Sequence, residues 1–434
     1  MSKTSWYLGH GAIWKQVVEG SCIYVPSSSR ALPLDEVTTQ LLRELAQDDR
    51  CSESLPEILV NLVSEGVLTQ RADKGHPLVM NRVEPRLDYI VLRLTNACNL
   101  RCRHCFVASG KPEPGELSLA EIERLFKSLD IFDPLIVVLT GGEPLLSRDI
   151  FDVIMLAAEH KVAVDISTNG TLLDEPCLER FARLSNLRYV IISLEGPSAQ
   201  VHDYIRGSGN FDMTVALVRK LVERGIAVSV NHCVTGFNIA HLSRSIDLAL
   251  SLGAWSVHLA TVSESGRARD HWSDLSLTEE QRRRASLIGL RKYLETGRVF
   301  AGEAEREVMG IVTEPSNLQN CGVGYKWCMI YANGDIAPCR PLYAAVGAVG
   351  NIHDQSFESI WRDSPLMNEL RAVRADEIPR CKTCRSLSRC RAGCRVRAYT
   401  TAGSWVAPES ESFCQHYHFL NVEINRACWL WQIG

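Results

Sequence analysis

YIVLRLTNACNLRCRHCF, residues 89–106, joins an apolar run to a loop that carries three closely spaced cysteines. The run YIVLRL has the length and the β-branched content of a buried strand. Cys98, Cys102 and Cys105 follow it in a CxxxCxxC arrangement. Three thiolates can ligate three irons of a four-iron cluster, which leaves the fourth iron open to a small molecule. A zinc site would need a fourth ligand, for which His104 is the candidate within the loop, so spacing alone leaves both metals open.

The chain beyond this loop alternates further apolar runs with segments of helical period. The runs are LIVVLT (135–140), VAVDIS (162–167), YVIISL (189–194), AVSVNHCV (227–234) and SVHLA (256–260), and helical segments such as 118–129, 149–160 and 211–225 lie between them. Ser118 and Glu121 have capping-box spacing, so we expect a helix to begin there. Six strand–helix units predict an α/β fold, a partial (β/α)6 barrel of the TIM type around a parallel sheet.

Glycines and polar residues follow the second predicted strand, at the edge of the sheet where ligand sites gather in barrels of this type. The run ends in TGGEP, residues 140–144. Gly141 and Gly142 allow the backbone to approach a ligand closely, and Glu143 could accept hydrogen bonds from an ammonium group. Taken alone, GGEP also fits an ordinary strand-to-helix turn.

Together, the CxxxCxxC loop and the GGEP segment resemble the radical S-adenosylmethionine (SAM) superfamily over roughly residues 89–261. The resemblance implies an enzyme in which Cys98, Cys102 and Cys105 hold a [4Fe-4S] cluster that reductively cleaves SAM to a 5′-deoxyadenosyl radical. The implied contacts to SAM are Gly141, Gly142, Glu143, Pro144, Ser167, Asn169, Ser193, Glu195 and Arg206. Many relatives have Asp where this chain has Glu195. Without the resemblance, Arg206 would fit a solvated surface arginine equally well.

The remaining cysteines gather in the C-terminal third of the chain. Eight of the 16 lie between Cys321 and Cys414. Five others stand alone and fit small buried hydrophobic residues: Cys22, Cys51, Cys177, Cys233 and Cys428. The sequence shows neither a secretory pattern nor a membrane span, so we expect a cytoplasmic protein, in which metal ligation explains these thiols better than disulfides. The pattern CKTCRSLSRCRAGC, residues 381–394, is by itself compatible with zinc or with iron–sulfur.

This C-terminal layout closely resembles the SPASM extension of radical SAM enzymes that modify peptides and proteins. The resemblance implies two auxiliary [4Fe-4S] clusters, three clusters in all. It assigns Cys321, Cys328, Cys339 and Cys394 to the first auxiliary cluster and Cys381, Cys384, Cys390 and Cys414 to the second. Full ligation leaves no iron for a substrate thiol, which disfavours thioether formation on a cluster and favours electron relay. Sulfatase-maturing relatives have an aspartate after the third cysteine, and Arg340 in that position disfavours their activity here.

Residues 1–76 are predicted to form a small α+β, winged-helix-like domain. AIWKQVV (12–18) and SCIYVP (21–26) have strand patterns, and VTTQLLRELA (37–46) and LPEILVNLVSEG (55–66) have amphipathic helix patterns. The order resembles the precursor-peptide-recognition domain of the pyrroloquinoline-quinone pathway, in which a strand edge pairs with a peptide leader. A packing domain without a ligand is the alternative. The partial barrel is expected at 86–300 and the SPASM domain at 315–434.

The sequence therefore predicts a maturase of a ribosomally synthesised precursor peptide, supplied with electrons by a flavodoxin or ferredoxin. An intramolecular cross-link is the expected product, with a carbon–carbon or other non-thioether bond favoured. The balance of 47 basic and 51 acidic residues gives no reason to expect nucleic acid as a partner, and no membrane partner is expected. Three alternatives stay open: a radical SAM enzyme acting on a tetrapyrrole or another small molecule, a thioether-forming or sulfatase-type maturase, and a non-catalytic iron–sulfur or zinc scaffold.

Overall fold

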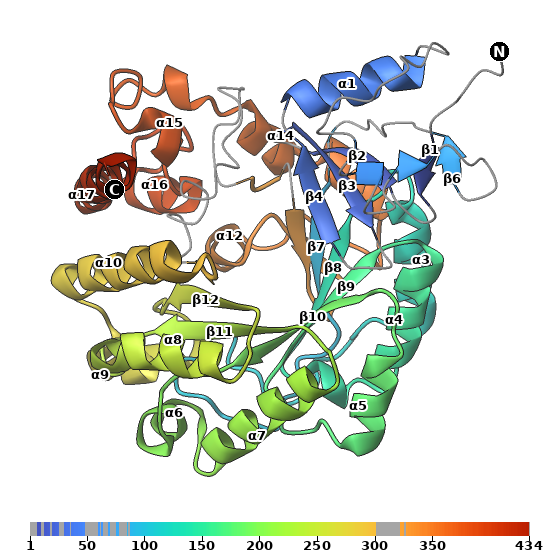
Figure 1. Ribbon diagram of the computed structural model, residues 1–434, viewed down its shortest axis with the longest axis horizontal. Coiled ribbons are helices and arrows are strands. Elements are labelled where there is room, and N and C mark those ends of the chain that lie inside the picture. The colour runs from blue at the N-terminus through green and yellow to red at the C-terminus, as the bar shows by residue number, and fades with distance from the viewer. Residues whose placement is uncertain are drawn as a thin grey trace.

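The computed structural model describes residues 87–300, 322–324 and 327–433, and parts of the N-terminal region. Those parts are 7–9, 13–17, 20–25, 30–34, 36–47, 60, 62, 63, 68, 69, 75–77 and 85. A ten-stranded sheet forms the centre of the molecule (Figure 1). Its parallel strands are β7 (Tyr89–Arg93), β8 (Ile136–Thr140), β9 (Ala163–Thr168), β10 (Leu187–Ser193), β11 (Val228–Val234), β12 (Ser256–Thr261) and the short β13 (Val299–Phe300). The six long strands coincide with the six predicted runs, so the α/β partial-barrel prediction is confirmed.

Helices connect the parallel strands and cover the outside of the sheet. They are α3 (Leu119–Leu129), α4 (Ile150–Glu159), α5 (Glu175–Ala182), α6 (Ala199–Arg206), α7 (Asn210–Glu223), α8 (Leu242–Ser251), α9 (Trp272–Leu275) and α10 (Glu279–Thr296), with 3₁₀ turns η3 (Pro144–Leu146), η4 (Ile239–His241) and η5 (Gly266–His271). The predicted capping box starts α3, where Glu121 accepts a hydrogen bond from the Ser118 N–H at 2.8 Å. Ile90 and Val137 point from the strands into the same core as Phe126 of α3, and all three side chains are fully buried.

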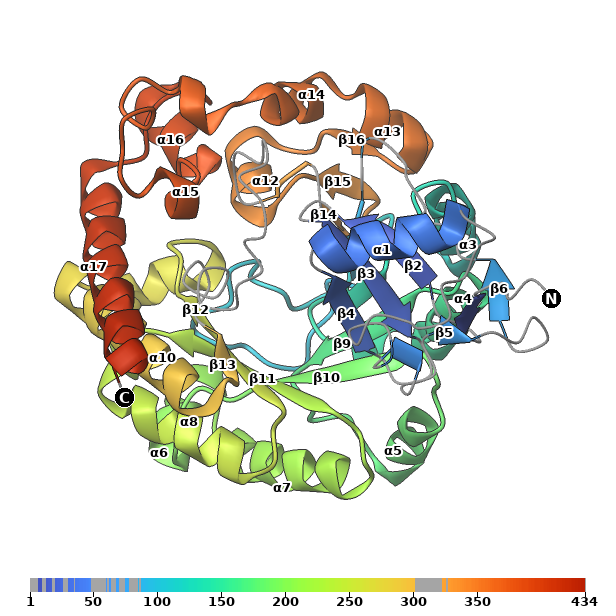
Figure 2. The ribbon, with the colours of Figure 1, turned by 45° about the horizontal axis from the view of Figure 1, so that its top comes forward.

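The C-terminal elements continue the barrel sheet. β14 (Trp327–Ile330) pairs in parallel with β7, and β15 (Asp335–Ala337) and β16 (Gly350–Asn351) extend the sheet antiparallel. The helices that follow are α12 (Arg340–Val346), α13 (Phe357–Asp363), α14 (Pro365–Ala372), η6 (Ala375–Glu377), α15 (Leu387–Cys390), α16 (Arg395–Ala402) and α17 (Glu411–Ile433). They form an arc in which α13 packs against α3 and α17 lies alongside α10 (Figure 2). The cysteine-rich region is thus attached to both sides of the barrel.

The N-terminal region contributes two small antiparallel sheets. One consists of β2 (Ile13–Val17), β3 (Gly20–Val25) and β4 (Arg30–Leu34), with α1 (Glu36–Gln47) packed against it. The other joins β1 (Tyr7–Gly9), β5 (Leu68–Thr69) and β6 (Gly75–Pro77). The sequence predicted β2, β3 and α1 but not β4, whose Pro33 is tolerated because β4 is an edge strand. The helix predicted at 55–66 lies for the most part outside the described residues.

Replacing Trp361 with Ala should lower the free energy of unfolding by about 3–5 kcal/mol, because it empties a core site on α13. The ring is fully buried and its Nε1–H donates to the Pro85 carbonyl at 3.1 Å. Urea denaturation measures the change. The matched control is Trp255→Ala, because the Trp255 side chain is 54% exposed and should cost about 1 kcal/mol. Equal losses in the two variants would contradict the packing role of Trp361.

Candidate active site

The loop after β7 that carries Cys98, Cys102 and Cys105, here called the cluster loop, packs directly against the GGEP segment at the end of β8. The Gly142 N–H donates to the Thr95 carbonyl at 2.7 Å, and the Glu143 N–H donates to the Ala97 carbonyl at 2.7 Å. A Cβ atom on Gly142 would lie 2.2 Å from the Ala97 oxygen and 2.6 Å from the Asn96 oxygen. Because both neighbours are backbone atoms, neither can yield to a side chain, and the two segments fit only with glycine at this position.

A single cavity lies at the carboxyl ends of the barrel strands, beside this contact. Ten of the predicted site residues line it: Cys98, Cys102, Cys105, Gly141, Gly142, Ser167, Asn169, Ser193, Glu195 and Arg206. They come from five different segments of the chain, and the structure brings them together because the carboxyl ends of parallel strands meet at one edge of the sheet. The predicted contacts Glu143 and Pro144 are not part of the cavity wall.

Glu143 is instead held by the protein itself. Its fully buried carboxylate accepts hydrogen bonds from the Thr168 hydroxyl at 2.5 Å, from the Asn169 N–H at 2.8 Å and from the Leu145 N–H at 3.2 Å. Burial raises the pKa of Glu143, and these hydrogen bonds oppose that rise. The side chain therefore ties the ends of β8 and β9 together beneath the glycines, and its oxygens are already occupied.

Glu195 and Arg206 form a buried ion pair on the wall of the cavity. Arg206 Nη2 lies 2.8 Å from Glu195 Oε1, and the second carboxylate oxygen accepts the Cys233 N–H at 2.7 Å. Burial by itself would raise the pKa of Glu195, but the charge of Arg206 and then the contact with His104 outweigh it and hold the pKa well below its usual range. Arg206 Nη1 also lies 3.9 Å from Cys102 Sγ. Arg206 is thus a largely enclosed arginine, 13% exposed, at the cluster loop and not a solvated one.

Arg267 belongs to the site and was missed by sequence reasoning. Its Nε donates to the Cys102 carbonyl at 3.1 Å and its Nη1 donates to the Ser109 carbonyl at 2.7 Å, so it connects the middle of the cluster loop to its C-terminal end. Gly266 before it has φ of +56°, and a Cβ there would lie 2.4 Å from the Cys105 oxygen. Their position in the sequence could have indicated this role, because Gly266 and Arg267 follow the end of the sixth predicted strand.

Arg340 also lines the cavity, from the C-terminal region. Its guanidinium carbon lies 3.6 Å from the centroid of the Phe106 ring, and Nη2 donates to the Ser263 hydroxyl at 3.3 Å. Phe106 directly follows Cys105, and Arg340 directly follows Cys339. This stacked contact therefore connects the initiating cluster loop to one of the predicted auxiliary ligands.

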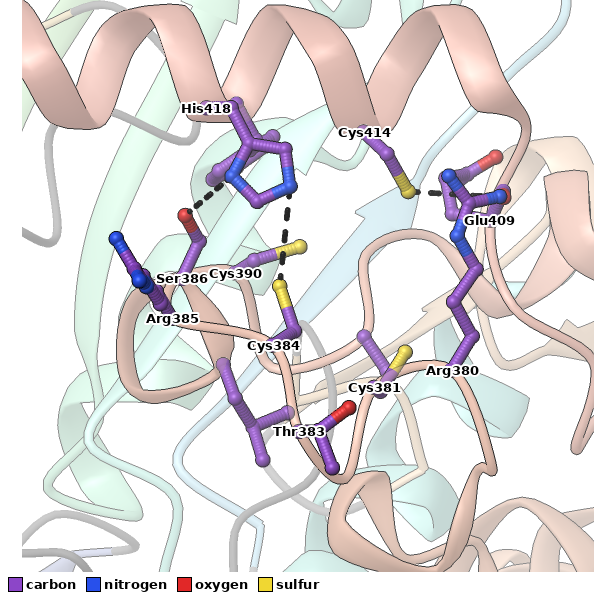
Figure 3. A pocket seen from close by; sticks show the side chains of 13 residues that line it. Arg380, Cys381, Thr383, Cys384, Arg385, Ser386, Cys390, Glu409, Cys414 and His418 are labelled. Atoms are coloured by element: carbon purple, nitrogen blue, oxygen red, sulfur yellow. Dashed lines mark hydrogen bonds between the residues drawn. The ribbon is translucent and has the colours of Figure 1, made fainter.

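The second set of predicted auxiliary ligands surrounds one cavity between the segment 380–392, which contains α15, and helix α17 (Figure 3). The four thiols that line it belong to Cys381, Cys384, Cys390 and Cys414. His418 reaches toward them, with Nε2 3.9 Å from Cys384 Sγ and Nδ1 3.1 Å from the Ser386 hydroxyl. A CxxC turn, a short helix and a distant helix thus place four thiols around one space.

The first predicted auxiliary set is placed only in part. Cys339 and Cys394 pack in one small apolar cluster, whereas the fully buried Cys328 belongs to the main core cluster. Cys321 lies outside the described residues. Among the described residues no three Cys, His, Asp or Glu side chains converge closely enough to ligate a single metal ion.

Comparisons with known proteins agree with this geometry. Residues 92–249 match the family model of the radical SAM superfamily, and residues 321–385 match the SPASM model, described as an iron–sulfur cluster-binding domain. The mycofactocin maturase MftC of Mycobacterium tuberculosis (strain CDC 1551 / Oshkosh) is 32% identical over 347 residues, which cover 78% of this chain and 87% of MftC. The chain belongs to the radical SAM superfamily. It is a member with a C-terminal SPASM domain, and it is an enzyme.

Two further similarities bear on this radical SAM enzyme. The AdoMet-dependent heme synthase of Methanosarcina barkeri (strain Fusaro / DSM 804) is 30% identical over 347 residues, which cover 76% of this chain and 96% of that protein. The crystal structure of Streptococcus suis SuiB bound to SAM superposes with a TM-score of 0.67 at 17% identity, and the match covers 94% of this chain and 100% of SuiB. The second similarity establishes the fold alone.

Membership implies SAM and iron–sulfur clusters as cofactors, and the residues present fit both. Burial raises the pKa of the Cys98 and Cys102 thiols and of the Cys381 and Cys414 thiols. Iron binds the thiolate form, so metal binding would displace protons from these buried groups. The only predicted acidic side chain on the wall of the first cavity, Glu195, is already neutralised by Arg206, which leaves the thiols as its available anionic ligands among the predicted residues.

The helices give no sign of membrane insertion. Across the part of the chain that the structure describes, no helix combines the length and the apolar character that crossing a bilayer requires.

Substituting Gly142 with Ala should push the Ala97 backbone away and displace the cluster loop. We expect about a 100-fold slower formation of 5′-deoxyadenosine, since a misplacement of about 1 Å has that effect on other catalytic sites. Product formation is measured by liquid chromatography, together with iron content. Gly110→Ala is the matched control, because a Cβ there meets nothing within 4 Å. A wild-type rate in Gly142→Ala would show that the close approach is unimportant.

Proposed function

We propose that this radical SAM enzyme matures a ribosomally synthesised precursor peptide. The main support for this proposal is the cavity in which the three loop thiols, the GGEP glycines and Arg206 meet. The chain is also similar to the maturase MftC over 78% of its length. We assign residues 1–76 to peptide recognition, 86–300 to the partial barrel and 315–434 to the SPASM domain. The reaction would take place in the cytoplasm.

The predicted site residues that line the cavity would bind the cluster and SAM between them. Cys98, Cys102 and Cys105 would hold the [4Fe-4S] cluster, which with SAM supplies a 5′-deoxyadenosyl radical when both are bound. The Arg206 guanidinium suits the carboxylate of SAM by its paired donors, and Glu195 fixes its orientation. Gly141 and Gly142 open the backbone to the amino group. Ser167, Asn169 and Ser193 offer polar groups to the nucleoside.

The C-terminal cysteines would hold two auxiliary [4Fe-4S] clusters, which makes three clusters in the chain. Cys381, Cys384, Cys390 and Cys414 surround one cavity and would hold the second of them. Cys321, Cys328, Cys339 and Cys394 would hold the first. With every iron ligated by protein, the auxiliary clusters would transfer electrons. A flavodoxin or ferredoxin would supply these electrons. Phe106 and Arg340 provide a contact between the cluster loop and Cys339.

The three-stranded N-terminal sheet supports leader binding. β3 lies between β2 and β4, so each outer strand has one edge that no strand pairs with among the described residues. An extended peptide can add to such an edge through backbone hydrogen bonds. SuiB, whose fold this chain shares, has been solved bound to its precursor peptide SuiA. We therefore place the leader on this sheet, with the core peptide in the barrel.

The product we propose is an intramolecular cross-link without a thioether. Closed auxiliary clusters offer no iron to a substrate thiol. The residue after Cys339 is Arg340, which lines the cavity as a cation and cannot act as the base that sulfatase-type maturation uses. Thioether formation and sulfatase-type maturation are the weaker assignments for this reason.

A tetrapyrrole substrate is the second candidate, favoured by the 30% identity to the heme synthase of M. barkeri. The two candidates differ in what residues 1–76 do. The discriminating experiment incubates the reduced enzyme with SAM and either the short peptide encoded beside the gene or an iron-coproporphyrin. A mass change in the peptide supports the maturase, whereas a change in the porphyrin alone would replace it.

The triple variant Cys98→Ala, Cys102→Ala, Cys105→Ala should abolish SAM cleavage, because it removes every protein ligand of the initiating cluster. The protein should lose one cluster's share of iron, about four atoms per chain, and keep the rest. Anaerobic reconstitution, iron analysis and assay of 5′-deoxyadenosine after dithionite reduction measure both effects. Continued cleavage by the triple variant would refute the site assignment.

Cys414→Ala should separate SAM cleavage from peptide modification. It opens the second auxiliary site, so SAM cleavage should persist while modified peptide falls about tenfold or more relative to 5′-deoxyadenosine. The ratio of the two products is the measurement. Cys177→Ala is the matched control, since this half-buried thiol lines neither cysteine cavity. A ratio equal to that of the control would remove the auxiliary cluster from the reaction.

A further inference from the structure

A second cavity adjoins the active cavity and has a different chemistry. It lies between the end of β12, helix α10, and helices α16 and α17, and its volume is about 570 Å³. Ala260 and Thr261 at the end of β12 line both cavities, so the two share a wall. None of the described residues that line the second cavity is a cysteine, which sets it apart from the two cavities lined by thiols.

Two arginines face this cavity from elements that are far apart in the sequence. Arg282 comes from the first turns of α10 and Arg397 comes from α16. Arg397 Nε donates to Glu409 at 3.2 Å, and its guanidinium lies 4.1 Å from the centroid of the Phe413 ring. For Arg282, the described residues provide no carboxylate within ion-pair distance. Within the described part of the chain, one of the two cations on the wall therefore lacks an anionic partner.

The other described residues of the wall do not supply that anion. Among them Glu279 is the one acidic residue, and Arg283 pairs with it. Burial lowers the pKa of Arg282 and the charge of Arg397 lowers it further. A nearby carboxylate would have the opposite effect. The cavity thus carries an excess of positive charge.

Neutral donors complete the surface. Ser410 and Ser412 lie at the start of α17, a 23-residue helix whose first N–H groups carry partial positive charge. His416 Nε2 lies 3.2 Å from the Ser286 hydroxyl, and its Nδ1 is buried with no hydrogen-bond partner among the described residues. Every polar feature of the wall apart from Glu279 suits an anion.

We infer that this cavity binds a carboxylate of the peptide substrate, with Arg282 as its principal partner and Arg397 as the second. That the carboxylate belongs to a peptide rests on the proposed function. That the ligand is a carboxylate is inferred from the two arginines. A guanidinium offers paired donors that match the two oxygens of a carboxylate. Because the cavities share Ala260 and Thr261, an anchored carboxylate fixes which neighbouring carbon of the peptide enters the active cavity. Arg282 is thus a specificity-determining residue.

The test uses the reconstituted enzyme with SAM and three fluorinated probes. N-trifluoroacetyl-glutamate α-amide presents a side-chain carboxylate, N-trifluoroacetyl-alanine a chain-terminal carboxylate, and N-trifluoroacetyl-glutamine amide neither. Fluorine NMR line widths report binding. The acid probes should bind more tightly than the neutral one, and Arg282→Gln should weaken that binding about tenfold or more. The acid probe that is affected more strongly identifies the source of the carboxylate.

Two further variants serve as controls. Arg282→Lys keeps the charge and should retain part of the binding. Arg291→Gln removes the same charge from α10 at a site that is 81% exposed and pairs with Glu295, and it should bind like the wild type. Iron content and circular dichroism establish that each variant is folded.

The possible failures are distinguishable. Equal binding of acid and neutral probes, or unchanged binding in Arg282→Gln, overturns the carboxylate site and leaves the maturase proposal intact. Coproporphyrin III, which carries four propionates, is titrated in parallel by its absorbance. If its binding depends on Arg282 while neither amino-acid probe binds, the peptide assignment falls together with the proposed function.

Discussion

The close approach of Gly142 to the carbonyl oxygens of the cluster loop is the constraint on which the site depends. A side chain at this position would enter the backbone of Asn96 and Ala97. With glycine there, the end of β8 and the loop after β7 exchange backbone hydrogen bonds, and Glu143 extends the connection to β9. Three strand ends and the three thiols therefore form one rigid unit, which is the condition for holding a reactive cofactor in a fixed position.

Pairing of β14 with β7 determines how the cysteine-rich region meets the barrel. It continues the barrel sheet from its first strand, and α17 returns to α10 on the far side. As a result the C-terminal region contributes Arg340 to the active cavity, and its helices α16 and α17 form part of the second cavity. Both cavities therefore take part of their wall from the C-terminal region.

Arginine is the recurrent polar partner around these cavities. Arg206 is neutralised by Glu195, and Arg267 is satisfied by backbone carbonyls of the cluster loop. Arg340 rests on Phe106, and Arg282 faces open space. Arg267 is committed to the protein framework, whereas Glu195 holds Arg206 in place for the proposed contact with the SAM carboxylate. Arg340 and Arg282 face the cavities, where a bound substrate can reach them, which agrees with a substrate that carries electron-rich groups.

The sequence by itself determined the local features: six strands, the start of α3, the three-cysteine loop and the GGEP turn. These follow from periodicity and from short spacings, which depend on neighbouring residues alone. The tertiary structure decided the remainder. It buried Arg206 against Glu195, turned Glu143 inward, gathered Cys414 with three distant cysteines and placed Arg267 on the loop. It also set Arg282 opposite Arg397. Such contacts join segments far apart in the chain, and no local pattern specifies them, because they arise only when helices and strands pack.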